Sequence, residues 1–253
     1  MGNSDSHSSV TPFLSVVIPA FNEEARIGPT LDKVTEYLAD QSYSWEVIVV
    51  DDGSSDATSD VVSERTRSLG GVRLERVSHG GKGWAVRHGM FAASGSLRFM
   101  CDADLAMPIG QLSSFVDRME EGYDVVIGSR QMSGARRFGE LFSRHVRGRV
   151  FSWFVSLVAV GGYADTQCGF KCFRSEAADR LFGLQRTRGM GFDVEVLYLA
   201  RKLGLRVVEI PIDWYHNSDS SVRGVVDSLS MFKDTLKVRL HDLKGGYEPE
   251  SGP

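Results

Sequence analysis

Short, continuously apolar runs alternate with longer helical stretches through the first half of the chain. Runs that are apolar at every position predict strands buried on both faces, as in parallel sheets covered by helices. The predicted strands are Leu14–Ile18, Glu46–Val50, Val72–Val77, Leu97–Cys101 and Asp124–Ile127. The predicted helices between and after them are Pro29–Ala39, Ala57–Leu69, Lys82–Ala93 and Gln111–Glu121. The pattern indicates an α/β fold with a mostly parallel, Rossmann-like sheet flanked by helices.

Net charge, cysteine content and the length of the longest apolar stretch exclude several classes of protein. The chain has 253 residues and a formal net charge of −4, which excludes a globally basic nucleic-acid coat. Its three cysteines are too few for a disulfide framework, so we expect a reducing, cytoplasmic environment. Its densest apolar stretch, Val150–Val160, is too short to cross a bilayer. We expect one domain over residues 13–243, a disordered tail over 1–12 and a second tail over 244–253.

Polar clusters follow three of the predicted strands at the point where each strand ends. They are Pro19–Glu24, Asp51–Ser55 and Asp102–Asp104. Ligands of open α/β sheets bind outside the carboxyl ends of the strands, so these loops are expected to converge. Two carboxylates two residues apart can face one hard cation, although two solvated turn aspartates would give the same pattern. The pattern favours a nucleotide site with a metal ion.

A glycine-rich segment, Gly80–Gly83, fits neither common phosphate-binding motif. A Walker A loop requires serine or threonine after the lysine, where Gly83 stands. A dinucleotide fingerprint requires a third glycine and a place after the first strand, and this segment has neither. Both motifs are rejected.

These motifs together resemble family 2 glycosyltransferases of the GT-A fold. The family-wide part consists of Ser15–Glu24, Val49–Ser55, Gly80–Gly83 and Asp102–Asp104. The second half is similar to the dolichyl-phosphate β-glucosyltransferase branch of the family, through Asp165–Lys171, Gly191–Tyr198 and Glu209–Trp214. Mannosyl relatives commonly carry Gln where this chain has Ala106, which argues against the mannosyl branch.

The resemblance implies a UDP-sugar donor and a divalent metal, Mg²⁺ or Mn²⁺. One of the paired aspartates after the second strand would accept a hydrogen bond from uracil. The donor residues that it implies are Pro19, Ala20, Asn22, Glu23, Asp51, Asp52, Gly53, Ser54, Lys82, Asp102 and Ala103. The metal ligands that it implies are Asp102, Asp104 and, as an extra ligand, His216, for which a surface loop histidine is the alternative.

An arginine-rich segment suits the acceptor side of such a reaction. A phosphate monoester is already anionic near neutral pH, so it requires charge compensation more than a general base. Arginine binds phosphate through a bidentate fork. Within twenty residues, six arginines are opposed by Glu140 alone. We expect Arg136, Arg137, Arg147 and Arg149 to contact a lipid phosphate, although a solvated arginine face is the alternative for any one of them.

Two amphipathic stretches follow from the same pattern. Val150–Val160 joins the arginines to an aromatic stretch, which fits an interfacial helix or core packing. Val225–Leu240 predicts a C-terminal amphipathic helix with lysines beside its apolar face. With a polyprenyl phosphate as acceptor, these elements would hold the enzyme peripherally at the cytoplasmic face of a membrane.

In the family, acidic residues of the second-half motifs face the reacting centre. The resemblance therefore implies that Asp165, and after it Asp193, lies near the acceptor phosphate or the sugar. Each could instead be a helix N-cap. Arg130 and Arg144 complete the expected catalytic set.

We therefore predict an inverting, metal-dependent transferase that moves glucose from UDP-glucose to a polyprenyl phosphate, giving a β-glucosyl-phosphoryl polyprenol. The alternatives are another donor sugar (N-acetylglucosamine or mannose) or a soluble acceptor. A nucleotidyltransferase is less favoured, because Pro19–Glu23 has neither the glycine nor the basic residue of such enzymes. The intact Asp102 and Asp104 weigh against a non-catalytic nucleotide-sugar-binding module. Oligomeric state is not predicted.

Overall fold

The structure is a computed structural model that describes residues 11–139, 160–216 and 224–247, with side chains in the last segment from residue 231. The elements in chain order are β1 (Leu14–Ala20), α1 (Ile27–Ala39), β2 (Trp45–Asp51), α2 (Thr58–Ser68), β3 (Val72–Arg76), α3 (Lys82–Ala92), β4 (Leu97–Met100), η1 (Ile109–Gln111), α4 (Leu112–Glu120), β5 (Val125–Ser129), β6 (Arg136–Phe138), β7 (Lys171–Arg174), α6 (Ser175–Leu184), α7 (Phe192–Lys202), β8 (Val207–Pro211), β9 (Asp213–Tyr215) and α8 (Gly224–Leu243). The predicted strands and helices of the first half are all present, with ends that differ by one or two residues.

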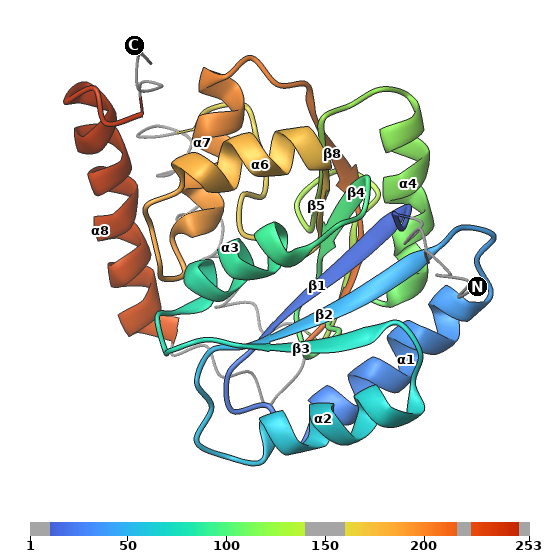
Figure 1. Cartoon of the computed structure of the whole chain (residues 1–253). Helices are drawn as coiled ribbons and strands as arrows, with labels where there is room; N and C mark the ends of the chain where they lie inside the picture. The colour runs from blue at the N-terminus through green and yellow to red at the C-terminus, as the bar shows by residue number, and fades with distance from the viewer. Residues whose placement is uncertain (1–10, 140–159, 217–223, 248–253) are drawn as a thin grey trace, which may run out of the picture.

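A seven-stranded sheet runs through the centre of the molecule in the order β3-β2-β1-β4-β7-β5-β8 (Figure 1). Only β7 runs antiparallel to its neighbours, β4 and β5, so the prediction of a mostly parallel sheet is confirmed. Because the chain adds β2 and β3 on one side of β1 and then β4 on the other, the strand order reverses beside β1. Such a reversal opens a crevice at the carboxyl ends of the strands.

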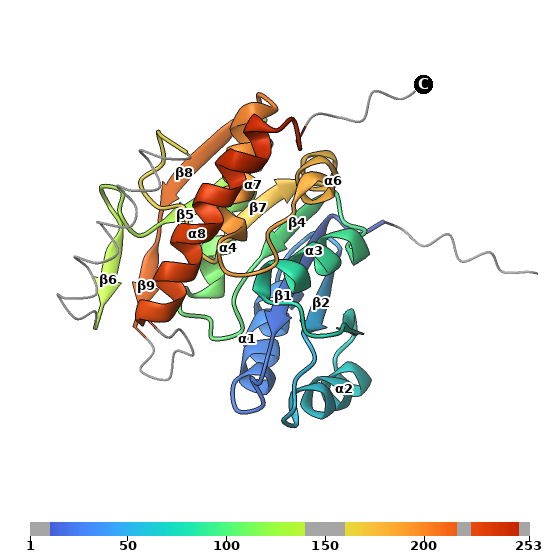
Figure 2. The ribbon, with the colours of Figure 1, turned by 90° about the vertical axis from the view of Figure 1, so that its left-hand side faces the viewer.

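Helices cover both faces of this sheet. On one face α1, α2 and α4 cover the sheet and contribute Leu31, Val62 and Phe115 to one core cluster. On the other face α3 and α6 contact the strands and α7 packs on these two helices, around a second core cluster that includes Val17, Ile48 and Val50. Figure 2 shows α8 lying outside this second layer, where it contacts α7. Alternate residues of one strand point to opposite faces, which is why buried strands of this kind are apolar at every position.

The second half of the chain contains strands and helices that the sequence analysis did not predict. β6 and β9 form a separate two-stranded parallel sheet, on which the rings of Phe138 and Tyr215 stack with centroids 4.5 Å apart. The predicted aromatic stretch Val150–Val160 lies outside the described residues except for Val160, which is buried. No helix in the described part of the chain is long and apolar enough to span a membrane.

Candidate active site

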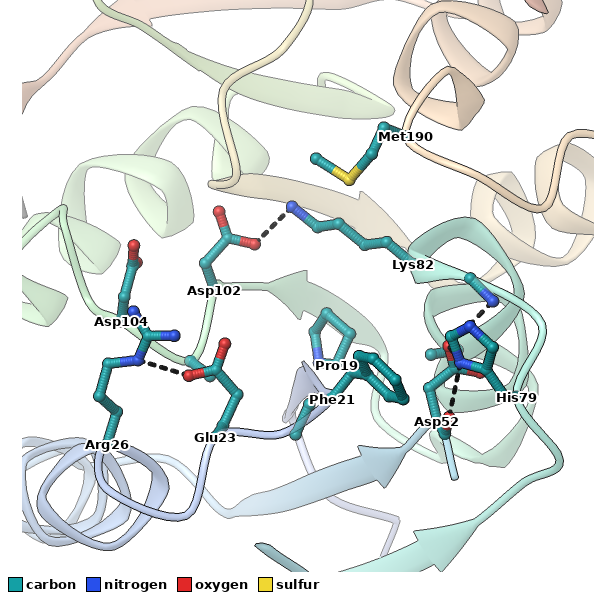
Figure 3. A pocket seen from close by; sticks show the side chains of 14 residues that line it. Pro19, Phe21, Glu23, Arg26, Asp52, His79, Lys82, Asp102, Asp104 and Met190 are labelled. Carbon is teal, nitrogen blue, oxygen red and sulfur yellow. Dashed lines mark hydrogen bonds and ion pairs between the residues drawn. The ribbon is translucent and has the colours of Figure 1, made fainter. Parts of the chain in front are cut away.

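A pocket of about 410 Å³ opens at the carboxyl ends of β1, β2 and β4 (Figure 3). The loops after these strands and the start of α3 supply most of its wall. Its lining consists of Pro19, Ala20, Phe21, Glu23, Arg26, Asp52, His79, Gly81, Lys82, Ala85, Asp102, Ala103, Asp104 and Met190. The three polar clusters of the sequence therefore converge, as the sheet predicts.

Hydrogen bonds between the first two loops set the shape of one wall. The backbone N–H of Asn22 donates to the Ser54 hydroxyl at 2.9 Å, and the Asn22 side-chain oxygen accepts from the Ser55 N–H at 2.9 Å. Asn22 has φ of 54°, a left-handed conformation that asparagine tolerates better than most residues. Asn22, Gly53 and Ser54 are absent from the lining, so the structure gives them a role in shaping the loops.

The structure separates the two aspartates at the end of β2. Asp51 is turned inward, where it accepts from the Ser54 N–H at 2.9 Å and from the Ser59 hydroxyl. Asp52 lines the pocket, and its carboxylate accepts from the N–H groups of Gly80 and Gly81 at 2.8 and 2.9 Å. Of the pair, Asp52 is the one placed to meet a ligand.

An ion pair crosses the floor of the pocket. Lys82, the first residue of α3, holds Asp102 with a 2.6 Å contact between Nζ and Oδ1 (Figure 3). Burial alone would raise the pKa of the Asp102 carboxyl, but the charge of Lys82, with Lys171 and Arg130 behind it, lowers the pKa below its usual value. Asp102 is therefore ionised and already bound to a cation of the chain.

Asp104 is less well compensated by nearby cations than Asp102 is. Burial, followed by the charge of Asp102, raises its pKa. Burial also raises the pKa of Glu23, which is paired with Arg26 at 2.5 Å and feels the negative charge of Asp104 and Asp102. Glu23, Asp102 and Asp104 line one cavity, and a divalent cation bound by the two aspartates would offset the repulsion between these carboxylates. The residues present therefore fit Mg²⁺ or Mn²⁺.

His216 is not grouped with these aspartates. Within residues 11–139, 160–216 and 224–247, no cluster of three or more His, Cys, Asp or Glu side chains is arranged to hold a metal ion. The His216 ring lies 5.7 Å from that of Trp214, and its backbone N–H donates to the Phe138 carbonyl. The two aspartates would therefore require donor oxygens to complete a coordination shell, and a role for His216 as a ligand stays a prediction.

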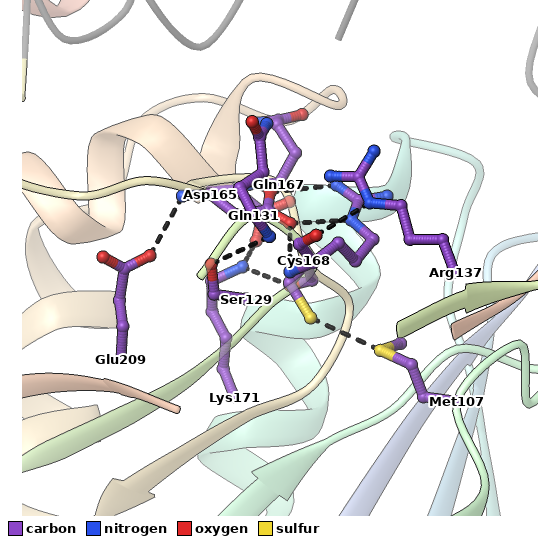
Figure 4. Close-up of polar contacts among 11 residues, drawn as sticks. Met107, Ser129, Gln131, Arg137, Asp165, Gln167, Cys168, Lys171 and Glu209 are labelled. Atoms are coloured by element: carbon purple, nitrogen blue, oxygen red, sulfur yellow. Dashed lines mark hydrogen bonds and ion pairs between the residues drawn. The ribbon is translucent and has the colours of Figure 1, made fainter. Parts of the chain in front are cut away.

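A second polar network, drawn in Figure 4, surrounds Asp165. This carboxylate is 1% exposed and accepts from the Arg130 guanidinium at 2.7 and 2.9 Å and from the Arg130 N–H at 3.0 Å. The Glu209 carboxylate in turn accepts from the Asp165 N–H at 2.9 Å. Burial opposes ionisation, but Arg130 and its hydrogen bonds hold the pKa of Asp165 at about 2. Asp165 thus positions Arg130, whose charge reaches Asp102.

The low pKa of Asp165 predicts acid sensitivity. Its contribution to stability is present above its unfolded pKa of about 3.8 and is lost as the pH falls through about 2. Asp165→Asn removes this dependence. We expect the difference in unfolding free energy between wild type and Asp165→Asn to shrink by about 2 kcal/mol between pH 5 and pH 2. Urea denaturation across this range measures it, and a constant difference would contradict the assignment.

Asp193 forms the other buried pair. Its carboxylate, 3% exposed, accepts from Lys171 Nζ at 2.5 Å, and the same ammonium donates to the Cys168 carbonyl at 2.6 Å. Burial raises the pKa of Asp193, and the charges of Lys171 and Lys82 counter that rise. Neither Asp165 nor Asp193 lines the pocket. Each holds a cation of the chain, and their assignment to the reacting centre stays a prediction.

The arginine-rich segment is only partly described. Arg136 pairs with Asp213 at 2.9 and 2.5 Å, and Arg137 Nε donates to the Arg130 carbonyl at 2.7 Å. Both arginines belong to β6, where Arg137 contacts Arg130 and Arg136 remains 69% exposed. Arg144, Arg147 and Arg149 lie outside the described residues.

Six residues that line the pocket are absent from the predicted site set: Phe21, Arg26, His79, Gly81, Ala85 and Met190. Phe21 lies within the first motif and Arg26 follows it, and the Phe21 ring stacks on His79 with centroids 4.3 Å apart. Met190 reaches the pocket from the loop before α7, far along the chain. The position of Phe21 beside Asn22 at a strand end was a usable signal. Met190 had none, because only tertiary packing brings its loop to α3.

Comparison with known proteins identifies the fold and its relatives. Residues 15–182 match the family described as Glycosyl transferase family 2. The human protein named dolichyl-phosphate beta-glucosyltransferase is 35% identical over 96% of this chain and 79% of its own length. A Dictyostelium discoideum protein of that name is 32% identical over 94% of this chain and 77% of its own.

Solved structures share the architecture at lower identity. One is glucosyl-3-phosphoglycerate synthase from Mycobacterium tuberculosis in complex with Mn²⁺, UDP-glucose and phosphoglyceric acid. It is 21% identical, with a TM-score of 0.64 over 95% of this chain and 82% of that one. At this identity the likeness establishes the fold, which is the GT-A type that the motifs predicted.

Proposed function

The chain belongs to glycosyl transferase family 2, and on that premise we propose that it transfers glucose from UDP-glucose to a polyprenyl phosphate of the dolichyl type. Membership makes it a glycosyltransferase and sets aside the nucleotidyltransferase and the non-catalytic module. The acceptor proposal is supported by relatives above 30% identity that are named dolichyl-phosphate beta-glucosyltransferase. The observation that carries the donor proposal is the pocket, in which Asp52, Lys82, Asp102 and Asp104 converge at the strand reversal.

The donor would lie across the crevice with its base near β2. Asp52 lines the pocket, and its carboxylate is held in a fixed orientation by two backbone N–H groups and by His79 Nδ1 at 2.9 Å. Lys82 and Arg26 also line the pocket and would supply positive charge for the phosphates. Asp102 and Asp104 would hold Mg²⁺ or Mn²⁺, which when bound neutralises charge on the departing diphosphate.

Binding of the donor would rearrange the pairs within the pocket. Lys82 holds Asp102 in this structure, with its Nζ 2.6 Å from the carboxylate. Diphosphate oxygens would offer Lys82 a second anionic partner, and Asp102 would then be available to hold the cation. The chain therefore keeps its own lysine as a counter-ion for the metal-binding carboxylate.

The acceptor chemistry requires charge compensation more than a base. A phosphate monoester is largely dianionic near neutral pH, so its oxygen can attack the anomeric carbon in line as UDP departs. Such an attack inverts the anomeric configuration and gives a β-linked product. Asp165 orients Arg130, and the charge of Arg130 helps to lower the pKa of Asp102. We therefore assign Arg130 to the acceptor phosphate. Because the acceptor resides in a bilayer, the enzyme would work at a membrane surface.

A donor panel tests the proposal. The protein is incubated with Mn²⁺, a short water-soluble polyprenyl phosphate and, in turn, UDP-glucose, UDP-N-acetylglucosamine or GDP-mannose, and release of the nucleotide is measured. We expect release only with UDP-glucose and only with the phosphorylated acceptor. Release with another donor would contradict glucose as the transferred sugar. In a parallel incubation phosphoglyceric acid replaces the polyprenyl phosphate, and release with that acceptor only would contradict the lipid acceptor.

A further inference from the structure

The outward face of α8 carries an apolar stripe that the fold does not bury. Leu236, Leu240 and Leu243 are 40%, 57% and 78% exposed, and Phe232 continues the stripe at 39%. Their spacing of three and four residues places them on one side of the helix. Val238 and Thr235, on the opposite side, are buried at 1% and 0% exposure. The inner face of the helix is therefore packed against the fold, and the exposed stripe faces solvent. Figure 2 shows that α8 lies at the surface of the molecule.

Basic side chains border this stripe on both sides. Lys233, Lys237 and Lys244 follow one edge, and Arg239, which lies over the Tyr198 ring, follows the other. Lys237 remains 74% exposed although it contacts Asp234. The acids of residues 231–244 are drawn toward the fold: Asp234 and Asp242 are 13% and 18% exposed, and Asp242 pairs with Lys202 and Tyr198.

An apolar stripe between rows of cations is the pattern of a helix that lies in the plane of a bilayer surface. Leucine side chains enter the acyl boundary, and lysines extend along it so that their ammonium groups meet anionic headgroups. A second copy of the chain fits less well, because it would bring the same cations against one another. We propose that the outer face of α8 is the surface through which this protein docks on an anionic membrane.

The inner side of α8 connects this surface to the pocket. Asp234 packs so closely on the loop before α7 that a Cβ atom added at Gly191 would come within 2.6 Å of the Asp234 Cβ. That loop carries Met190 into the donor pocket. At the far end of the helix, the buried Tyr247 hydroxyl donates to Glu195 of α7. A docked α8 would therefore present the pocket wall near the bilayer, where the acceptor of the proposed function resides.

Vesicle sedimentation of the full chain tests the docking surface directly. Wild type should bind vesicles of phosphatidylcholine with phosphatidylglycerol, weakly bind pure phosphatidylcholine, and dissociate at high salt. Leu240→Gln with Leu243→Gln should weaken binding at least about tenfold. Lys233→Gln with Lys237→Gln should weaken it about 30-fold, since each lysine near an anionic surface contributes roughly fivefold. Matched controls are Phe91→Gln, an apolar residue 47% exposed on α3, and Lys33→Gln with Arg67→Gln on α1 and α2.

The outcomes distinguish a failure of this inference from a failure of the proposed activity. The inference rests on the proposed function only in taking the acceptor to be a lipid of the bilayer. With the water-soluble acceptor, the α8 variants should release UDP at the wild-type rate. With vesicle-borne acceptor they should be impaired in proportion to their binding. Wild-type vesicle binding by both α8 variants would overturn the docking surface whatever the activity shows. A dimer that the leucine substitutions dissociate would assign the stripe to a second copy and overturn it equally.

Discussion

Asp104→Ala should lose turnover by about 10³-fold or more, because it removes a carboxylate that the proposed metal requires and so about 4 kcal/mol of transition-state charge stabilisation. The same change should cost little stability. Burial and the neighbouring Asp102 raise the pKa of Asp104, so its ionised form opposes folding at neutral pH. The hydrogen bond lost from the Ala106 N–H to Asp104, 3.1 Å long, accounts for about 1 kcal/mol at most.

The experiment measures UDP release under the conditions of the donor panel and unfolding by urea on the same preparation. Asp60→Ala is the matched control, since Asp60 is an acid 88% exposed on α2 and lies outside the pocket. Mn²⁺ titration followed by its paramagnetic resonance signal supplies a readout independent of turnover. Wild-type turnover in Asp104→Ala, or unchanged Mn²⁺ binding in the presence of UDP, would refute the metal assignment.

Local sequence patterns were sufficient to predict the parallel strands of the sheet and the loops at their carboxyl ends that line the pocket. Apolar runs such as Glu46–Val50 identify buried strands without reference to the rest of the chain. Parallel pairing then brings their carboxyl ends to one edge, so Asp52 and Asp104 could be placed together from sequence. The antiparallel insertion of β7 between β4 and β5 was not predictable in this way, because strand order depends on long-range pairing.

The partners of the charged residues could not be predicted from local patterns. The expected place of Asp165 and Asp193 at the reacting centre stays a prediction, but their ion-pair partners, Arg130 and Lys171, were not foreseen. These partners lie 35 and 22 residues away along the chain, and only the packed sheet brings them into contact. Sequence identifies residues that carry charge, whereas tertiary packing decides whether a charge faces a ligand or another side chain.

Breaking the Lys171–Asp193 pair should cause the largest loss of stability. Both side chains are almost fully buried, so Lys171→Met would leave a carboxylate without its cation in a site closed to water. Removing one member of a buried pair costs about 3–5 kcal/mol. The loss should be smaller at pH 5 than at pH 8, because an acid whose pKa is raised in the folded state opposes folding more as the pH rises.

Replacing both partners distinguishes the effect of the buried charges from the effect of altered packing. Lys171→Met with Asp193→Leu removes both charges together, and we expect it to recover most of the unfolding free energy that Lys171→Met loses. Arg118→Met is the matched control, since it breaks an exposed pair with Glu121 and should leave stability nearly unchanged. Urea denaturation at pH 5 and pH 8 measures all three. If Lys171→Met unfolds like wild type at pH 8, the buried charge is satisfied by other groups and the pair is not what holds α7 against β7.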